Sequence, residues 1–374
     1  MMFVPVKRSL KAFFLVICAL GLGGCGNPDP HVIGFIGGLS GRVADLGVAG
    51  RNGVLMAVEE RNEAGGVNGR QVHLEIRDDR QDEASALTGV AELLDKDVAL
   101  IIGHMTSSMS TKTLPLMNEK RVLMLSPTAT TQQLTGIDDY FIRVMNDDAI
   151  NARNNALYCY KNLGLRRMAV VYDTGNAAYT QSWLSGFRDA FTEQGGQITQ
   201  VIPFRSGDDV HFTPLAEKAL RGDPDGVQLI VGAVDAALLS QQLRKLAPDL
   251  PLATSEWAAT EKLITLGGAA VEGVVTAQLF NRDDPTPGYR AFKQAFEQRF
   301  SQPPGFAEIA GYDAARVALS ALAQQRDDES LKQTVIRLGS FPGAQGTILI
   351  DRFGDSFRNS VITKVEGGAF SLLQ

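Results

Sequence analysis

Four hydroxyl side chains follow one apolar run in the first third of the chain. The run VALIIG occupies residues 98–103, and the next seven positions contain Thr106, Ser107, Ser108 and Ser110. Because serine and threonine are good helix N-caps, a strand end followed by a helix start would explain these residues without any ligand. The interpretation that we favour is a small-molecule site at the carboxyl end of a parallel strand.

The next apolar run ends in the same way. Residues 121–126 (RVLMLS) are typical of a strand that Pro127 stops, and Thr128 and Thr130 follow. Neighbouring parallel strands bring their carboxyl ends to one edge of a sheet, so both groups of hydroxyls would lie together. The repetition favours ligand binding over helix capping.

These hydroxyls need a sheet to position them, and the pattern of the chain predicts one. Short β-rich runs alternate with amphipathic helical patterns. The first series has strands at 31–37, 72–77, 98–103 and 121–126, with helices at 50–62, 83–94 and 109–120. The second series begins near residue 149, with strands at 168–172, 197–204, 227–231, 252–254 and 274–279, and helices at 179–194, 212–220 and 236–246. The alternation predicts an α/β fold of two lobes, each a parallel sheet covered by helices, with a ligand cleft between them.

The N-terminus has the features of a secretory signal peptide over residues 1–24. Lys7, Arg8 and Lys11 precede an apolar stretch of 11 residues, which is shorter than the ~20 residues that a membrane-spanning helix needs. The stretch ends in Leu22-Gly23-Gly24-Cys25, which resembles a bacterial lipobox. We therefore expect cleavage before Cys25, lipidation of its thiol and a tether over residues 25–30. Ordinary cleavage with an incidental cysteine is the alternative.

The net charge argues against nucleic acid as a partner, and the cysteine content argues against a disulfide. Loss of the signal removes three cations from a formal charge of −6, which leaves −9 and argues against nucleic acid as a partner. Cys18 would leave with the signal and Cys25 would be lipidated, so Cys159 would have no unmodified cysteine to pair with. With 44% hydrophobic residues, the remaining chain is long enough to build a core in each of two domains.

Motifs of enzymes and metal sites are missing from the sequence. No G-x-S-x-G elbow occurs, and no G-x-G-x-x-G follows a predicted strand. The histidines at 31, 73, 104 and 211 lack paired metal-ligand spacing. We interpret Asp78-Asp79 as a strand end that orders the next loop through local hydrogen bonds, and His104 as structural support. We expect no enzymatic activity and no cofactor.

An ordered set of motifs extends through the predicted exported chain. The motifs are IGFIGGLSG at 33–41, GRNG at 50–53, NEAGGVNG at 62–69, IGHMTSS at 102–108, SPTAT at 126–130 and GYDA at 311–314. Together they resemble type I periplasmic binding proteins of the branched-chain amino acid ABC transporter substrate-binding family. The resemblance implies two Rossmann-like lobes joined by three crossovers near 148, 278 and 353. Lobe 1 would comprise 31–148 plus 279–353, and lobe 2 would comprise 149–278 plus 354–374.

The resemblance also implies roles for the hydroxyls of the first lobe. Ser107 matches the serine that binds the α-carboxylate of an amino acid, Thr130 matches a threonine that contacts the ligand, and Thr128 matches a position that offers backbone groups. Ser108 would add a hydroxyl donor. A helix beginning near Met109 would direct free N–H groups and a partial positive charge at the same point.

In the second lobe the resemblance implies contacts for the ammonium group. Glu256 matches a glutamate that accepts it, and Tyr179 matches a tyrosine that lines the cleft. Asp235, placed at the end of the strand pattern VQLIVGAVD, stands where relatives often carry an aromatic residue, so we expect a polar ligand or a second ammonium contact there. Leu46 and Trp257 would supply apolar walls. Arg42 could bind an anion, although a solvated charge is the simpler interpretation.

The sequence therefore predicts an extracytoplasmic, lipid-anchored receptor of an ABC importer. Its ligand would be an amino acid, branched-chain, related or polar, and its protein partner an ABC permease. The alternative is a sensing module for a small carboxylate or amide that reports to a signalling partner. The same fold serves both.

Overall fold

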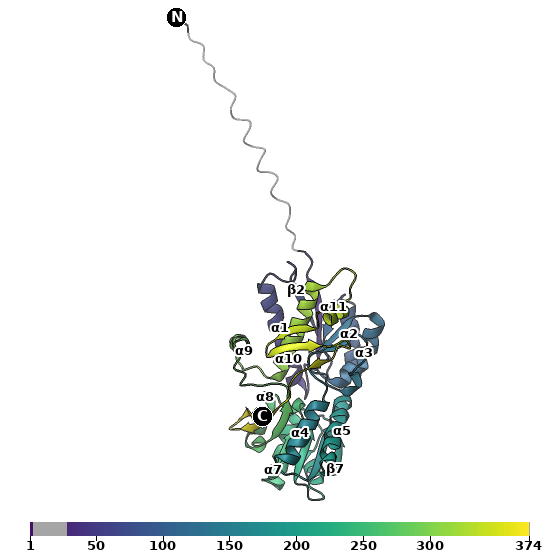
Figure 1. Cartoon of the computed structure of the whole chain (residues 1–374), viewed down its shortest axis with the longest axis vertical. Helices are drawn as coiled ribbons and strands as arrows, with labels where there is room; N and C mark the ends of the chain where they lie inside the picture. The colour runs from purple at the N-terminus through teal and green to yellow at the C-terminus, as the bar shows by residue number, and fades with distance from the viewer. Residues whose placement is uncertain (3–27, 374) are drawn as a thin grey trace.

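The computed structural model describes residues 1–2 and 28–373 as two α/β lobes stacked along the long axis of the molecule (Figure 1). Cys25, most of the predicted signal peptide and the first residues of the predicted tether lie outside the described residues. None of the described helices combines the length and the apolar character that crossing a bilayer requires.

The first lobe is built on a five-stranded parallel sheet in the order β2-β1-β3-β4-β5. Its strands are β1 (His31–Gly37), β2 (Val72–Asp78), β3 (Leu100–Ile102), β4 (Leu123–Ser126) and β5 (Phe141–Arg143). The helices that connect them are α1 (Ala44–Glu63), α2 (Glu83–Leu94) and α3 (Ser107–Lys120), and the short 3₁₀ helix η1 spans Gln132–Leu134. Strands β3 and β4 are buried along their whole length and apolar except for Ser126 at the end of β4, as expected where helices cover both faces of a parallel sheet.

The second lobe is built on a seven-stranded sheet in the order β15-β14-β10-β9-β8-β6-β7. The parallel strands are β6 (Arg167–Asp173), β7 (Gln197–Phe204), β8 (Gly226–Ile230), β9 (Leu252–Thr254) and β10 (Val275–Gln278), and β14 (Val361–Glu366) and β15 (Ala369–Leu372) add an antiparallel edge. The helices are α4 (Ala149–Lys161), α5 (Ala177–Glu193), α6 (Phe212–Ala219), α7 (Ala233–Leu246) and α8 (Glu261–Gly267), with the 3₁₀ helices η2 (Thr174–Asn176), η3 (Glu256–Ala258) and η4 (Gly268–Val271).

Between β10 and β14 the chain returns to the first lobe. This segment contains α9 (Pro287–Phe300), α10 (Phe306–Gln324), α11 (Leu331–Leu338) and a small antiparallel sheet of β11 (Ser340–Gly343), β12 (Gly346–Ile350) and β13 (Ser356–Phe357). Figure 1 shows α10 and α11 in the same half of the molecule as α1, α2 and α3. The lobe boundaries at 148, 278 and 353 stay a prediction.

Helices α1 and α10 cross with their backbones in contact. A Cβ atom on Gly53 would lie 1.9 Å from the carbonyl oxygen of Glu308, and a Cβ atom on Gly311 would lie 2.1 Å from that of Gly50. Only glycine leaves room for such an approach. The GRNG and GYDA motifs therefore meet at one helix crossing.

The predicted α/β fold of two lobes is confirmed, but four helix starts were wrong, among them that of α5, which begins at Ala177 instead of 179. Helix α1 begins at Ala44 instead of 50, because Gly50 and Gly53 lie inside it. Helix α3 begins at Ser107 instead of Met109. Helix α7 begins at Ala233, so Asp235 lies in its first turn and not at a strand end. Helices α4, α8, α9 and α11, strand β5 and the antiparallel strands β11 to β15 were not predicted.

Candidate functional site

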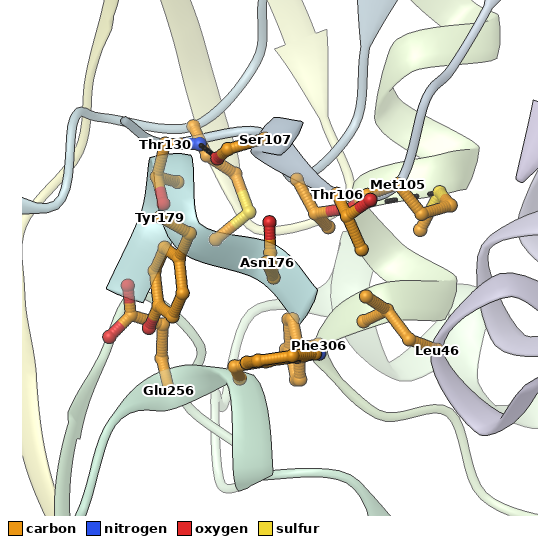
Figure 2. Close-up of a pocket in the computed structure, with 12 residues that line it drawn as sticks. Leu46, Met105, Thr106, Ser107, Thr130, Asn176, Tyr179, Glu256 and Phe306 are labelled. Carbon is orange, nitrogen blue, oxygen red and sulfur yellow. Dashed lines mark hydrogen bonds between the residues drawn. The ribbon is translucent and has the colours of Figure 1, made fainter. Parts of the chain in front are cut away.

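A small cavity lies between the two lobes. On the side of the first lobe it is lined by the loops that follow β3 and β4, by the start of α3 and by the first turn of α1. On the side of the second lobe it is lined by η2, the start of α5 and η3. Figure 2 shows Ser107 and Thr130 on one side of this space and Tyr179 and Glu256 on another.

Ser107 joins the two strand-end loops. Its buried Oγ accepts hydrogen bonds from the backbone N–H groups of Thr130 and Thr131, each at 3.2 Å. These two bonds occupy the acceptor capacity of the hydroxyl and leave its proton free to be donated. Ser107 is thus a fixed donor at the cavity wall, next to the N-terminus of α3, where the helix dipole favours an anion.

Thr128 and Thr130, in the loop after β4, differ in their hydrogen bonds. Thr128 donates its hydroxyl proton to the carbonyl oxygen of Met105 at 2.5 Å, which ties the two loops together. The Oγ1 atom of Thr130 is buried and has no hydrogen-bond partner among the described residues. A buried polar group without a partner is costly. This hydroxyl is therefore available to a ligand.

Helix capping does not account for the hydroxyl cluster. Thr106 holds the N-cap position of α3 but makes no side-chain cap bond, and its hydroxyl donates to Oε1 of Gln81 at 2.9 Å. Ser110 donates to the carbonyl oxygen of Thr106 within the helix. Ser107 bonds to the neighbouring loop instead of capping.

Glu256 is the acidic group of the cavity. Its side chain is almost wholly buried, and its Oε2 accepts the indole N–H of Trp183 at 2.9 Å. Its Oε1 has no hydrogen-bond partner among the described residues, although Asn151 and Tyr179 lie close to the carboxylate. Burial raises the pKa of Glu256 to about 7. No cationic side chain among the described residues forms an ion pair with it, so the site lacks a positive charge at this point.

A second buried carboxyl group, outside the residues that line the cavity, lies close to Glu256. Asp148 accepts the hydroxyl proton of Ser182 at 2.8 Å and an amide proton of Gln132 at 3.3 Å. Burial raises the pKa of Asp148 well above its usual value, and the charge of Glu256 adds to the shift. This end of the cavity therefore favours a cation.

Apart from Thr106 and Asn176, the rest of the cavity wall is largely apolar. Leu46 and Phe306 approach from α1 and α10, Met105 and Met145 from the loops after β3 and β5, and Trp257 from η3. The ring of Tyr179 meets Trp257 edge to face, with 5.8 Å between ring centroids, while its buried hydroxyl has no partner among the described residues. The cavity thus combines a hydroxyl end, an acidic end and an apolar wall.

Five of the predicted ligand residues line the cavity: Ser107, Thr128, Thr130, Tyr179 and Glu256. Ser108 and Asp235 do not. Ser108 bridges the lobes instead, since its N–H donates to Oδ1 of Asn176 at 3.0 Å and its Oγ accepts the N–H of Ala178 at 3.1 Å. Asp235 forms an ion pair with Arg42 at 3.2 Å. The predicted apolar residues Leu46 and Trp257 do line the cavity.

Sequence reasoning missed several of the cavity residues, among them Met105, Met145, Asn176 and Phe306. Met105 was within reach, because it lies between the end of β3 and the hydroxyl cluster. Phe306 comes from a helix more than 150 residues further along than Met145, and no local pattern marks either of them.

The Asp78-Asp79 pair orders the loops beside the site, as predicted. Asp78 accepts the backbone N–H groups of Leu39 and Arg80 at 2.8 and 2.9 Å. Oδ2 of Asp79 lies 2.7 Å from Nδ1 of the buried His104, whose carbonyl oxygen accepts the hydroxyl proton of Ser126. The described residues contain no group of three or more His, Cys, Asp or Glu placed to hold a metal ion.

The chain is similar to known proteins over most of its length. It is 25% identical to the leucine-, isoleucine-, valine-, threonine-, and alanine-binding protein of Pseudomonas aeruginosa over 333 residues, which cover 87% of each chain. The crystal structure of the leucine binding protein LivK from Thermotoga maritima matches with a TM-score of 0.85 and 28% identity, over 92% of this chain and 97% of that one.

A more distant structure shares the fold alone. The solute binding protein of an ABC transporter from Rhodopseudomonas palustris BisB5, solved with 3,4-dihydroxy benzoic acid, matches with a TM-score of 0.81 and 22% identity, over 91% of this chain and 95% of that one.

A family model described as periplasmic binding protein matches residues 30–369. The proteins of this family bind solutes and are not enzymes, so the predicted absence of enzymatic activity is confirmed. With the fold, the interlobe cavity and a match over nearly the whole described chain, the protein belongs to the periplasmic binding protein family.

Proposed function

We propose that this protein is the lipid-anchored receptor of an ABC importer and binds an α-amino acid with an apolar side chain, such as leucine, between its lobes. The observation that carries the proposal is the Oε1 atom of Glu256, which is buried at the cavity without a partner or a cation among the described residues. A ligand ammonium would supply the missing positive charge. A buried carboxylate gains most when a cation pairs with it.

The two ends of the cavity suit the two charges of an amino acid. The hydroxyls of Ser107 and Thr130 and the N-terminus of α3 would bind the α-carboxylate, and Glu256 with Tyr179 would bind the ammonium. These groups come from different lobes, so one zwitterion bridges both. Closure of the lobes is then favoured by the ligand, because only the closed arrangement satisfies both charges.

The apolar wall favours a hydrocarbon side chain over a polar one. Leu46, Met105, Met145, Trp257 and Phe306 offer few polar atoms to a ligand. Asp235, which the sequence suggested as a contact for a polar ligand, is engaged with Arg42 and lies outside the lining. The named ligands of the Pseudomonas and Thermotoga relatives support the same class.

The experiment is a calorimetric titration of the protein after unfolding and refolding, which removes any ligand retained from the cell. Leucine should bind, whereas benzoate, which has a carboxylate and no ammonium, should bind far more weakly. Lysine tests the side-chain preference. Binding of benzoate together with no binding of leucine would contradict the role given to Glu256.

Lipidation and delivery form the second part of the proposal. The lipobox-like LGGC ending at Cys25 supports an anchor on the extracytoplasmic face of a membrane. The lobe boundaries at 31–148 plus 279–353 and at 149–278 plus 354–374 belong to the same proposal. Cys25→Ser should release the protein from the membrane fraction, and a variant that still sediments with membranes would argue against the anchor.

A further inference from the structure

A charged contact joins the lobes beside the cavity. Arg42 lies in the loop between β1 and α1 in the first lobe, and Asp235 lies in the first turn of α7 in the second. The Nη1 atom of Arg42 is 3.2 Å from Oδ1 of Asp235. The Nε–H of the same guanidinium donates to the carbonyl oxygen of Gly207 at 2.9 Å. The guanidinium also lies 5.5 Å from the ring centre of Phe212.

This contact is shielded from water more than a surface ion pair is. The side chain of Asp235 is 4% exposed and that of Arg42 is 20% exposed. Exposed pairs contribute little to stability, whereas removing one partner of a buried pair leaves an uncompensated charge. Two further carboxylates, Asp45 and Asp173, raise the negative potential at Asp235, so Arg42 is the cation that compensates for it.

The first turn of α1 makes a second contact with the other lobe. Oδ2 of Asp45 accepts the hydroxyl proton of Thr260, next to η3, at 2.6 Å. Leu46, the following residue, lines the cavity. Arg42, before the start of α1, and Asp45, after it, therefore both contact the second lobe. These contacts hold the segment that carries Leu46, and neither of them involves a ligand.

We propose that the Arg42–Asp235 pair is a latch that stabilises the closed arrangement of the lobes independently of the ligand. The pair forms only in the closed state and stabilises it. Less ligand-binding energy is then needed to close the lobes, and the ligand dissociates more slowly. Two residues outside the cavity lining thus help to set affinity and residence time. The inference needs only that the lobes separate, and it does not depend on which ligand binds.

The experiment measures lobe separation in the ligand-free protein. Spin labels at Leu87→Cys on α2 and Leu246→Cys at the end of α7, both exposed positions, report the distance between the lobes by pulsed electron resonance. Cys18 and Cys25 are replaced by serine, and Cys159 is buried. The variants are Arg42→Gln, Asp235→Asn and their combination. Arg153→Gln is the matched control, because Arg153 pairs with Glu193 at 3.1 Å within the second lobe.

Each latch variant should enlarge the population with separated lobes, and the control should not. The dissociation rate of leucine should rise roughly threefold to tenfold in the same variants. The combined variant should do no more than the larger single change, because both substitutions remove one interaction. Distance distributions that match the wild type in both single variants would overturn the proposal whether or not leucine binds. If one variant misfolds, the other still decides.

Discussion

Trp183 holds one carboxylate oxygen of Glu256 by a hydrogen bond and leaves the other oxygen without a partner among the described residues. The indole N–H of Trp183 holds Oε2 at 2.9 Å, while Oε1 remains without a partner among the described residues at the wall of the interlobe cavity. The stacked rings of Trp183 and Phe187 on α5, with centroids 5.4 Å apart, leave the indole little freedom. The carboxylate is thus oriented before any ligand arrives, which reduces the entropy that binding must overcome.

Glu256→Gln should weaken leucine binding by at least tenfold, or about 1.4 kcal/mol, because a charged hydrogen bond to the ammonium is lost. Glutamine keeps the shape of the side chain and can still accept from Trp183. Calorimetry measures the change, with Glu193→Gln on the surface of α5 as the matched control. An unchanged affinity in Glu256→Gln would remove this residue from the ammonium site.

The affinity for leucine should depend on pH. Burial raises the pKa of Glu256 in the free protein to about 7, so acidification below that value protonates the group that the ammonium requires. Affinity should therefore fall as the pH drops from 8 to 5.5, and Glu256→Gln should flatten the profile. Burial raises the pKa of Asp235 to about 6, so this carboxyl group titrates in the same pH range. The pH profile of Asp235→Asn must therefore be measured in parallel. A flat wild-type profile would contradict the prediction.

Glu256→Gln, which removes the buried carboxylate charge, should stabilise the ligand-free protein at alkaline pH. The ordinary pKa of a glutamate is 4.5, and that of folded Glu256 is about 7, so the folded state binds more protons between these values. Stability then falls as the pH rises through this window. At pH 8, Glu256→Gln should therefore raise the melting temperature of the ligand-free protein. The difference should shrink at pH 4, and calorimetric melting at the two values checks it.

Substitution by valine should have different effects at Thr128 and Thr130, the two threonines of the loop after β4. Thr130→Val removes a hydroxyl that has no partner among the described residues, so affinity for leucine should fall severalfold with little loss of stability. Thr128→Val leaves the carbonyl oxygen of Met105 without its donor and should lower the melting temperature. Equal effects of both substitutions on binding and stability would argue against the assignment.

Gly53→Ala should destabilise the first lobe strongly. The added methyl would meet the carbonyl oxygen of Glu308 at 1.9 Å, and overpacking of this kind costs about 1–3 kcal/mol or more. Gly288→Ala in α9 is the control, because no atom lies within 4 Å of the added methyl. Urea unfolding curves measure both. Similar midpoints for the two variants would show that the helix crossing is looser than described.

The sequence sufficed for the parts of the site that depend on local pattern. Ser107, Thr128 and Thr130 follow apolar strands, and parallel sheets place strand ends together, so their proximity could be predicted. Helix starts were harder to place. Asp235 was assigned to a strand end because VQLIVGAVD is mostly apolar, whereas the strand stops at Ile230 and the helix begins at Ala233. Periodicity does not separate a buried strand from the first turn of a buried helix.

The apolar wall and the cross-lobe contacts could not be predicted from local pattern. Phe306 reaches the cavity through the packing of α10 on α1, and Arg42 was interpreted as a solvated charge because its partner lies 193 positions away. Such pairings depend on how the two lobes face each other. That relation appears only in three dimensions.

The crossing of Gly53 and Gly311 has a consequence for the order in which the polypeptide matures. These two glycines lie 258 positions apart in the sequence, so α1 is synthesised long before α10. Contacts between such distant segments slow folding, because a long loop must close before they form. The packing of α1 against α10 therefore forms only after this long loop has closed, so the first lobe completes its native core late in folding.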